Sequence, residues 1–228
     1  MTGSDGDSME IATLADGALK LLTNARQLYD EAVILRRAGR LSRSCFLHQI
    51  SLEECAKIAM LGALAASILT GQKTDLNRFF RAFASHRAKN FTNAYYLPLS
   101  EAESAAREEK QSKLAVEAFR QLQREFHSEA NTAKNASLYV DFRAGRFLSP
   151  SEQVSEDKVQ NIAAANEVFL STSTSKVELL RRWADKPEEV RRELGWLMTR
   201  LKKLATETDD PDTALTSSLD EALARLAR

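Results

Sequence analysis

The stretch LSRSCFLHQISLEECAKIAMLGALAASIL, residues 41–69, decides the fold. It contains no proline, and small or apolar residues, with one histidine among them, recur in it at alternating steps of four and three, which is the spacing of one helical face. That face comprises Leu41, Cys45, His48, Leu52, Cys55, Ala59, Gly62 and Ala66. From Ile58 to Leu69 apolar residues lie all round the helix, which indicates burial by several neighbours. The sequence therefore predicts a core helix over 41–69, and its uncharged run of about a dozen residues is shorter than the roughly twenty that a membrane span needs.

Polar residues in the first half of this helix allow two interpretations. Gln49, Glu53 and Lys57 form one row along the helix, in which Glu53 and Lys57 are spaced to pair one turn apart. Glu54 and His48 flank the same segment. The row is either a solvated surface beside the buried face or the wall of a polar pocket inside a helical bundle.

The composition favours an all-α protein. The chain has 228 residues, a mass of 25.4 kDa and 43% hydrophobic residues, enough for one good core with or without an appendage. Its eight glycines and four prolines are few for this length. The 32 basic and 32 acidic residues balance, so the overall charge does not indicate nucleic-acid binding and leaves only a local basic patch as a route to it.

The start of the chain indicates a cytoplasmic protein, and the two cysteines are expected to be free. The polar, acidic start MTGSDGDSME lacks the basic and apolar segments of a signal peptide, and residues 1–8 are expected to form a disordered tail. Cys45 and Cys55 are separated on the predicted helix by about 15 Å, which is too far for a disulfide bond. Both are expected to be small core residues, and no cysteine pair has the spacing of a metal site.

Outside the central helix, periodicity and turn residues predict further helices. The first should run over 9–38 and end at Gly39, and the short connection makes it antiparallel to the central helix. Further helices are expected over 76–91, 101–136, 156–184, 188–206 and 213–227, with a short strand over 138–142 and a turn at FRAGRF. These elements predict a helical bundle over 9–184 and a C-terminal helical extension over 185–228, interpreted as an appendage or an oligomerisation arm.

The common catalytic and metal-binding motifs are missing from the sequence. It has no phosphate-binding loop of the GxxxxGK[ST] type, no GxGxxG, no GxSxG and no HExxH. Glu53 and Glu54 are adjacent acids, but no Glu-x-x-His repeat accompanies them to form a di-iron site. No metal and no cofactor are therefore expected.

Each of the three histidines follows an arginine with four to six residues between them. The pairs are Arg43 with His48, Arg81 with His86, and Arg120 with His127. On a helix, such an arginine and histidine lie near enough to reach one phosphate, where histidine can move protons and arginine can stabilise the charge of a ribonuclease transition state. Because arginine is common in this chain, roughly one histidine in four would meet the spacing by chance. The three pairs cannot all be active sites.

Several short motifs follow one another along residues 24–184. They are Asn24-Ala25 before a striped helix, Glu53-Glu54-x-x-Lys57, His86-x-x-Lys89, and Leu138-Tyr139-Val140-Asp141 followed by Ser149-Pro150. In this combination the chain resembles the AbiV type of abortive infection protein, a branch of the HEPN superfamily of antiparallel helical bundles. The resemblance implies a bacterial antiphage protein that acts in the cytoplasm and arrests growth or translation after infection.

The resemblance also implies where a site would lie. Many HEPN proteins are metal-independent ribonucleases that dimerise to bring two Arg-x4-6-His motifs together. Carried onto this chain, the best catalytic pair is Arg81 and His86, because it lies beside Lys89. The supporting polar cluster comprises Glu53, Glu54, Lys57, Lys89, Tyr139 and Asp141. In this hypothesis Glu54, Lys57, His86 and Tyr139 converge on one site.

Two classes of function stay open. In the first, the protein is a ribonuclease whose homodimer builds the site, with His86 as acid or base and Arg81 and Lys89 holding phosphate. In the second, it is a non-catalytic binding module that captures a phage protein or a component of translation, and Glu54 and Lys57 are then a structural cluster. A third alternative is an antitoxin-like partner of a nucleotidyltransferase. The expected partners are thus a second copy, RNA and a phage-encoded activator protein.

Overall fold

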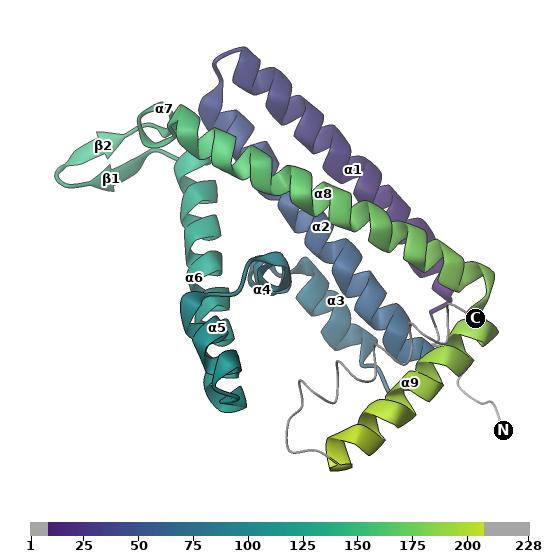
Figure 1. The fold of residues 1–228 in the computed structure, drawn as a ribbon. Helices are drawn as coiled ribbons and strands as arrows, with labels where there is room; N and C mark the ends of the chain where they lie inside the picture. The colour runs from purple at the N-terminus through teal and green to yellow at the C-terminus, as the bar shows by residue number, and fades with distance from the viewer. Residues whose placement is uncertain (1–8, 208–228) are drawn as a thin grey trace.

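The computed structural model describes residues 9–207, and helices account for most of them (Figure 1). The longer helices are α1 (Ile11–Arg37), α2 (Leu41–Leu69), α6 (Ser112–Leu138), α8 (Glu156–Asp185) and α9 (Pro187–Glu207). The shorter elements are α3 (Leu76–Ala84), α4 (His86–Asn93), the 3-10 helix η1 (Ala94–Tyr96), α5 (Glu101–Glu108), α7 (Pro150–Gln153), β1 (Asp141–Arg143) and β2 (Arg146–Leu148). The all-α class that the composition predicts is confirmed.

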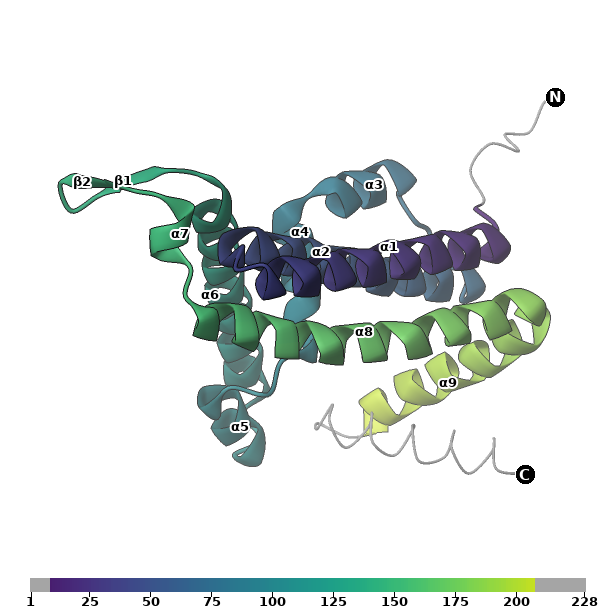
Figure 2. The same ribbon diagram turned by 90° about the horizontal axis from the view of Figure 1, so that it is seen from above.

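Three long helices enclose the core. α1 and α2 form the expected antiparallel hairpin, and α8 lies along both of them (Figure 1 and Figure 2). The main cluster of buried side chains draws on all three helices and includes Leu14, Leu22, Ile58, Leu61, Val177 and Leu180. Burial of apolar surface between these helices is therefore the main force that holds the bundle together.

The connection between α1 and α2 turns at Gly39. Its φ of 71° lies in the left-handed region that glycine adopts without strain. The amide of Gly39 donates to the carbonyl of Arg36, and the amide of Arg40 donates to the carbonyl of Leu35. This pair of hydrogen bonds is the Schellman motif of helix ends, so the predicted stop is formed as expected.

A second group of elements packs against α2 on another side. α4 lies between α2 and α6, and α5 folds back against α6 (Figure 1). The axis of α6 makes a wide angle with that of α8. The two helices therefore diverge from the end of the molecule that carries the β-hairpin (Figure 1). The polar first half of α2 is thereby covered by α4 and α6.

The helix expected over 76–91 is wrong in its continuity, because the chain breaks at Ser85. This residue has an extended backbone, with φ −77° and ψ 122°, and its hydroxyl accepts the amide of Ala88 at 3.4 Å. Ser85 thus caps the N-terminus of α4, which is a strong preference of serine. The break places His86 at the first residue of a new helix.

The helix expected over 101–136 is also wrong in its continuity. It ends at Glu108 and restarts at Ser112, because Lys110 takes a φ of 55°. The amides of Lys110 and Gln111 donate to the carbonyls of Arg107 and Ala106, respectively. α5 therefore ends in a second Schellman motif, with lysine where glycine is usual.

The strand expected over 138–142 is wrong in its bounds. Residues up to Leu138 belong to α6, and the strand covers Asp141–Arg143. It pairs antiparallel with β2, and Ala144 and Gly145 turn the hairpin with φ values of 50° and 78°. Two consecutive residues of positive φ are typical of tight two-residue hairpin turns.

The C-terminal part of the described chain joins the core. α9 begins at Pro187, and its residues Val190 and Leu194 pack against the main buried cluster. The division of the chain into a bundle over 9–184 and an extension over 185–228 stays a prediction. The tail expected over 1–8 and the helix expected over 213–227 lie outside the described residues. Within residues 9–207 no helix combines the length and apolar character required to cross a membrane.

Candidate functional site

One buried carboxylate, that of Glu53 on α2, is the centre of the candidate site. Glu53 is only 4% exposed. His86 places Nδ1 2.7 Å from both carboxylate oxygens, Lys89 places Nζ 2.7 Å from Oε2, and Lys134 places Nζ 3.4 Å from Oε1. Because these partners belong to α4 and α6, the site exists only where α2, α4 and α6 meet.

The start of α4 positions two of the partners. The Ser85 cap makes His86 the first residue of the helix, and Lys89 follows three residues later on the same face. Lys89 is 5% exposed, so its ammonium group has exchanged water for the carboxylate of Glu53. Since an unpaired buried charge is costly, this ion pair fixes α4 on α2.

The surroundings of Glu53 keep its carboxylate ionised. Burial by itself would raise the pKa of Glu53, but the hydrogen bond and charge of Lys89 oppose it. The hydrogen bond from His86 and the charge of Lys134 act in the same direction as Lys89. The net result is a pKa below the ordinary value of 4.5.

His86 is arranged as a proton acceptor. Because Nδ1 faces the carboxylate of Glu53, the neutral imidazole carries its proton on Nδ1 and leaves the lone pair of Nε2 unprotonated. The His86 side chain is 56% exposed, and within residues 9–207 Nε2 makes no hydrogen bond. A carboxylate that orients a histidine through Nδ1 is also the arrangement of the serine protease triad.

Basic and aromatic side chains follow His86 on α4 and meet α6. The guanidinium of Arg87 lies over the ring of Phe91, 5.0 Å from its centroid. The ring of Phe91 meets that of His127 at 6.0 Å with an interplanar angle of 75°. Asn90 of α4 contacts α6, with its Nδ2 3.2 Å from Nδ1 of His127. These residues extend the site along the contact of α4 with α6 and give it the positive groups that suit a phosphate.

Glu54 and Lys57 form a separate pair on α2. Lys57 Nζ donates to Glu54 Oε1 at 2.6 Å, and the same ammonium group lies 5.5 Å from the centroid of the Phe83 ring. Glu54 is 8% exposed, so both acids of the Glu53-Glu54 sequence are buried. Lys57 therefore pairs with Glu54 and not, as expected, with Glu53. The interpretation of the row as a solvated surface is wrong for Glu53, whose carboxylate is buried in a polar cluster with residues of α4 and α6.

Three predicted residues lie apart from Glu53. Arg81 is exposed on α3, and within the described chain no hydrogen bond or ion pair links it to His86. Tyr139 is the C-cap of α6 and is 62% exposed. Asp141 opens β1, and its carboxylate accepts from Nε of Arg143 at 2.5 Å, which lowers the pKa of Asp141. The structure thus brings together Glu53, His86 and Lys89 of the predicted cluster and adds Lys134.

His48 and the two cysteines belong to the core. His48 is fully buried, and its Nδ1 lies 3.2 Å from Nδ2 of Asn166 on α8. Burial first, and the charge of Arg36 second, lower the pKa of His48 to about 4. Cys45 and Cys55 are free and buried, and burial raises the pKa of both thiols. These three residues stabilise the packing of α2.

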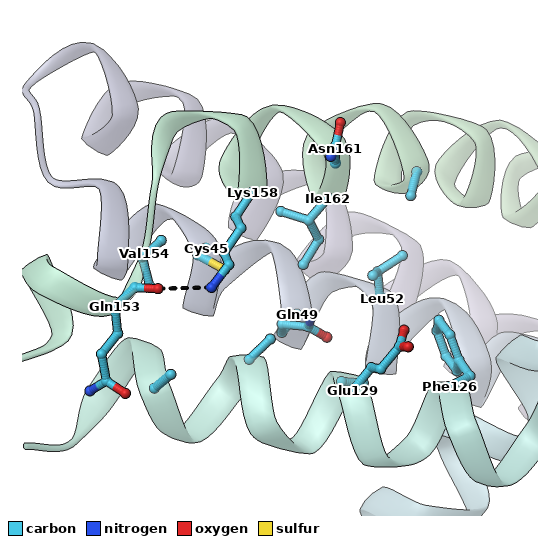
Figure 3. A pocket seen from close by; sticks show the side chains of 14 residues that line it. Cys45, Gln49, Leu52, Phe126, Glu129, Gln153, Val154, Lys158, Asn161 and Ile162 are labelled. Atoms are coloured by element: carbon cyan, nitrogen blue, oxygen red, sulfur yellow. Dashed lines mark hydrogen bonds between the residues drawn. The ribbon is translucent and has the colours of Figure 1, made fainter. Parts of the chain in front are cut away.

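A cavity of about 440 Å³ lies on another side of α2, where α6 and α8 diverge (Figure 3). Its walls are mostly apolar and include Leu52, Phe126 and Ile162. At one end Lys158 Nζ donates to the carbonyl of Gln153 at 2.9 Å (Figure 3). None of the predicted site residues lines this cavity. Among residues 9–207, no three histidine, cysteine or acidic side chains are grouped so that they could hold a metal ion.

Sequence reasoning missed Lys134, Arg87 and Asn90 as members of the site. Lys134 lies in a long charged helix in which nothing distinguishes it from its neighbours. Asn90 follows His86 by four residues on α4, a spacing that places both on one helical face. This spacing could have indicated that Asn90 lies near His86. It could not have indicated that Asn90 contacts α6.

Comparison with known proteins supports the class that the bundle and site indicate. The sequence model of the AbiV family, a HEPN family, matches residues 13–171. The chain therefore belongs to the AbiV family of the HEPN superfamily. An uncharacterized protein of Sinorhizobium fredii (strain NBRC 101917 / NGR234), y4gJ, is 34% identical over 154 residues, which cover 66% of this chain and 80% of that protein. No solved structure matches the chain.

Proposed function

We propose that this AbiV-family protein defends a bacterium against phage by cleaving RNA at the Glu53–His86 pair, which arrests growth or translation on infection. One observation carries the ribonuclease part of the proposal. The buried carboxylate of Glu53 holds Nδ1 of His86 at 2.7 Å, while most of the His86 side chain stays accessible. A histidine oriented in this way can remove a proton from a bound substrate.

The reaction follows from the groups present. Nε2 of His86 accepts the proton of an RNA 2′-hydroxyl, O2′ bonds to the adjacent phosphorus, and the bond from phosphorus to O5′ breaks. Lys134 and Arg87 stabilise the negative charge that develops on the phosphoryl oxygens. The nucleophile belongs to the RNA itself, so the displacement needs no metal-bound water.

Two predicted residues take revised or open roles in this proposal. Lys89 is buried against Glu53, so we assign it to positioning the carboxylate rather than to holding phosphate. Arg81 is exposed on the helix that precedes His86 and is proposed to bind the RNA backbone. Arginine suits this role because its guanidinium can bond two phosphate oxygens at once.

The cellular setting is part of the proposal. The protein acts in the cytoplasm, as a homodimer, on RNA that its own host needs. At its ordinary cellular level a protein of this kind has to be inactive until infection, when a phage-encoded activator protein would supply the signal. We propose that overproduced or purified protein forms the active dimer without this activator, because its concentration is high. Growth arrest of the infected cell then limits the spread of phage.

The proposal is tested by induced expression, with growth and a gel of total RNA as readouts. We expect the wild type to stop growth and fragment RNA, and His86→Ala and Arg81→Ala to do neither while remaining folded. Arg78→Ala, an exposed arginine one turn earlier on α3, is the matched control and should behave as the wild type. Growth arrest by His86→Ala with intact RNA would contradict the ribonuclease.

A second candidate function, the non-catalytic binding module, is favoured by the β-hairpin. Phe142 and Phe147 are 59% and 74% exposed, and their rings pair across the strands at 5.0 Å. Tyr139 and Val140 beside them are each 62% exposed. Exposed apolar side chains grouped in this way are typical of contact surfaces for another protein. If Phe142→Ser with Phe147→Ser abolished phage resistance and His86→Ala did not, this function would replace the ribonuclease.

A further inference from the structure

His127 of α6 lies beside the Glu53–His86 pair, and the proposed reaction does not yet use it. Its Nδ1 is 3.2 Å from Nδ2 of Asn90, and its ring packs on Phe91. Asn90 is one helical turn beyond His86 on the same face of α4, about 6 Å along the helix axis. The same chain therefore places two histidines near one another without help from a second copy.

Charged groups of two helices, α4 and α6, face His127. Arg87 and His86 belong to α4, Lys134 belongs to α6, and Lys134 in turn pairs with Glu53 of α2. Burial first, and then the charges of Arg87, Lys134 and His86, hold the pKa of His127 below its ordinary value of 6.5. A phosphate bound near Arg87 and Lys134 would offset their charge and favour protonation of His127. RNA binding would thus supply His127 with a proton to donate.

We infer that His127 is the second proton-transfer residue of the RNA-cleavage site, and that one chain supplies both it and His86. The inference rests on the proposed function and adds the group that the leaving oxygen requires. Without a proton donor, the bond to O5′ would have to break with a full alkoxide charge on the leaving group.

Protons and bonds balance in the complete step. Nε2 of His86 takes the 2′-hydroxyl proton while O2′ bonds to phosphorus, and protonated His127 gives its Nε2 proton to O5′ as the P–O5′ bond breaks. The products are a 2′,3′-cyclic phosphate and a 5′-hydroxyl, and both histidines return to their starting states by proton exchange with water. The Asn90 amide can serve either form of His127, since its nitrogen donates to the neutral ring and its oxygen accepts from the protonated ring.

The first test measures cleavage of an RNA oligonucleotide by the purified full-length protein and by His127→Gln. Glutamine keeps an amide that can bond Asn90 but cannot carry the proton. We expect the rate to fall on the order of 100-fold or more, with the unfolding transition kept. Cleavage by His127→Gln at the wild-type rate would overturn the inference and leave the proposed ribonuclease standing, whereas no cleavage by the wild type would overturn both.

The second test asks whether one chain supplies both histidines. His86→Ala and His127→Gln chains are co-expressed with different tags, and the mixed assemblies are purified and assayed. If both histidines come from one chain, the mixture stays as inactive as the single variants. If they come from opposite chains, one of the two sites in each mixed dimer is intact, and recovery of activity would contradict the inference.

A pH profile separates proton transfer from packing. We expect the rate to fall as the pH rises through the pKa of His127 in the RNA complex. Arg87→Gln removes a positive charge that lowers this pKa, so it should move the alkaline limb of the profile to higher pH. A limb that stayed in place would show that His127 does not carry the proton.

Discussion

At the scale of single residues, Glu53 combines structural and chemical roles. Its carboxylate balances the buried ammonium of Lys89 and orients His86, so the same group stabilises the contact of α2 with α4 and prepares the imidazole. The sequence indicated Glu53, His86 and Lys89 through their resemblance to AbiV motifs. It could not indicate Lys134, because that contact depends on how α6 packs and no local spacing encodes it.

Replacing Glu53 by glutamine tests the structural role. The ammonium of Lys89 would stay buried without a counter-charge, so we expect the free energy of unfolding to fall by about 3 kcal/mol. Urea unfolding followed by circular dichroism measures this loss. Glu178→Gln, an exposed glutamate on α8, is the control and should change stability by no more than about 0.5 kcal/mol. Equal stability of the two variants would show that Glu53 does not hold α4 in place.

His48 predicts how stability depends on pH. Its pKa is about 4 in the folded protein and near 6.5 when unfolded, so between these values the unfolded chain binds the extra proton. Stability is therefore complete above pH 6.5 and is lost as the pH falls, by about 2 kcal/mol between pH 7 and pH 5. His48→Asn should be less stable at pH 7 but should flatten this slope. Urea unfolding of the wild type and of His48→Asn at pH 7 and pH 5 measures this slope. An unchanged slope in His48→Asn would assign the acid sensitivity to other groups.

At the scale of elements, the quality of the boundary signals decided which helices could be predicted. Gly39 ends α1 in a Schellman motif, and a glycine at this position indicates that geometry in a sequence. Lys110 ends α5 in the same geometry. Because lysine does not indicate this geometry, the sequence does not predict the break between α5 and α6. The break at Ser85 had a signal, since serine is a preferred cap, but the helical pattern on both sides hid it.

Substitutions at the ends of α1 and α5 are expected to change the free energy of unfolding in opposite directions. Lys110→Gly should raise the free energy of unfolding by about 1 kcal/mol because it removes the strain of a left-handed lysine. Gly39→Ala should lower it by about 1 kcal/mol for the converse reason, even though an added Cβ would meet nothing within 4 Å.

Gly62 is the matched control for Gly39. It lies inside α2, and an added Cβ would also meet nothing within 4 Å, so Gly62→Ala should stabilise the protein by up to about 1 kcal/mol. Thermal unfolding of the three variants compares them directly. A loss of stability in Gly62→Ala, or a gain in Gly39→Ala, would contradict the assignment of these effects to backbone conformation.

At the scale of the whole molecule, the bundle separates its core from its site. α1, α2 and α8 bury the apolar side chains, while α4 and α6 cover the polar half of α2 and form the site there (Figure 1). The sequence predicted the first part, because an apolar run and a short connection specify an antiparallel hairpin. It could not predict the second, because the convergence of α4 and α6 on Glu53 depends on breaks and crossing directions that periodicity does not record.

The most direct test of the central claim is cleavage of RNA by the purified full-length protein in the presence of EDTA. We predict that the wild type cuts a single-stranded RNA into fragments with 2′,3′-cyclic phosphate and 5′-hydroxyl ends. His86→Ala should lose on the order of 100-fold or more of the rate while keeping its unfolding transition, and an oligonucleotide without 2′-hydroxyls should not be cut. RNA left intact by the wild type, or cut by His86→Ala at the wild-type rate, would contradict the account.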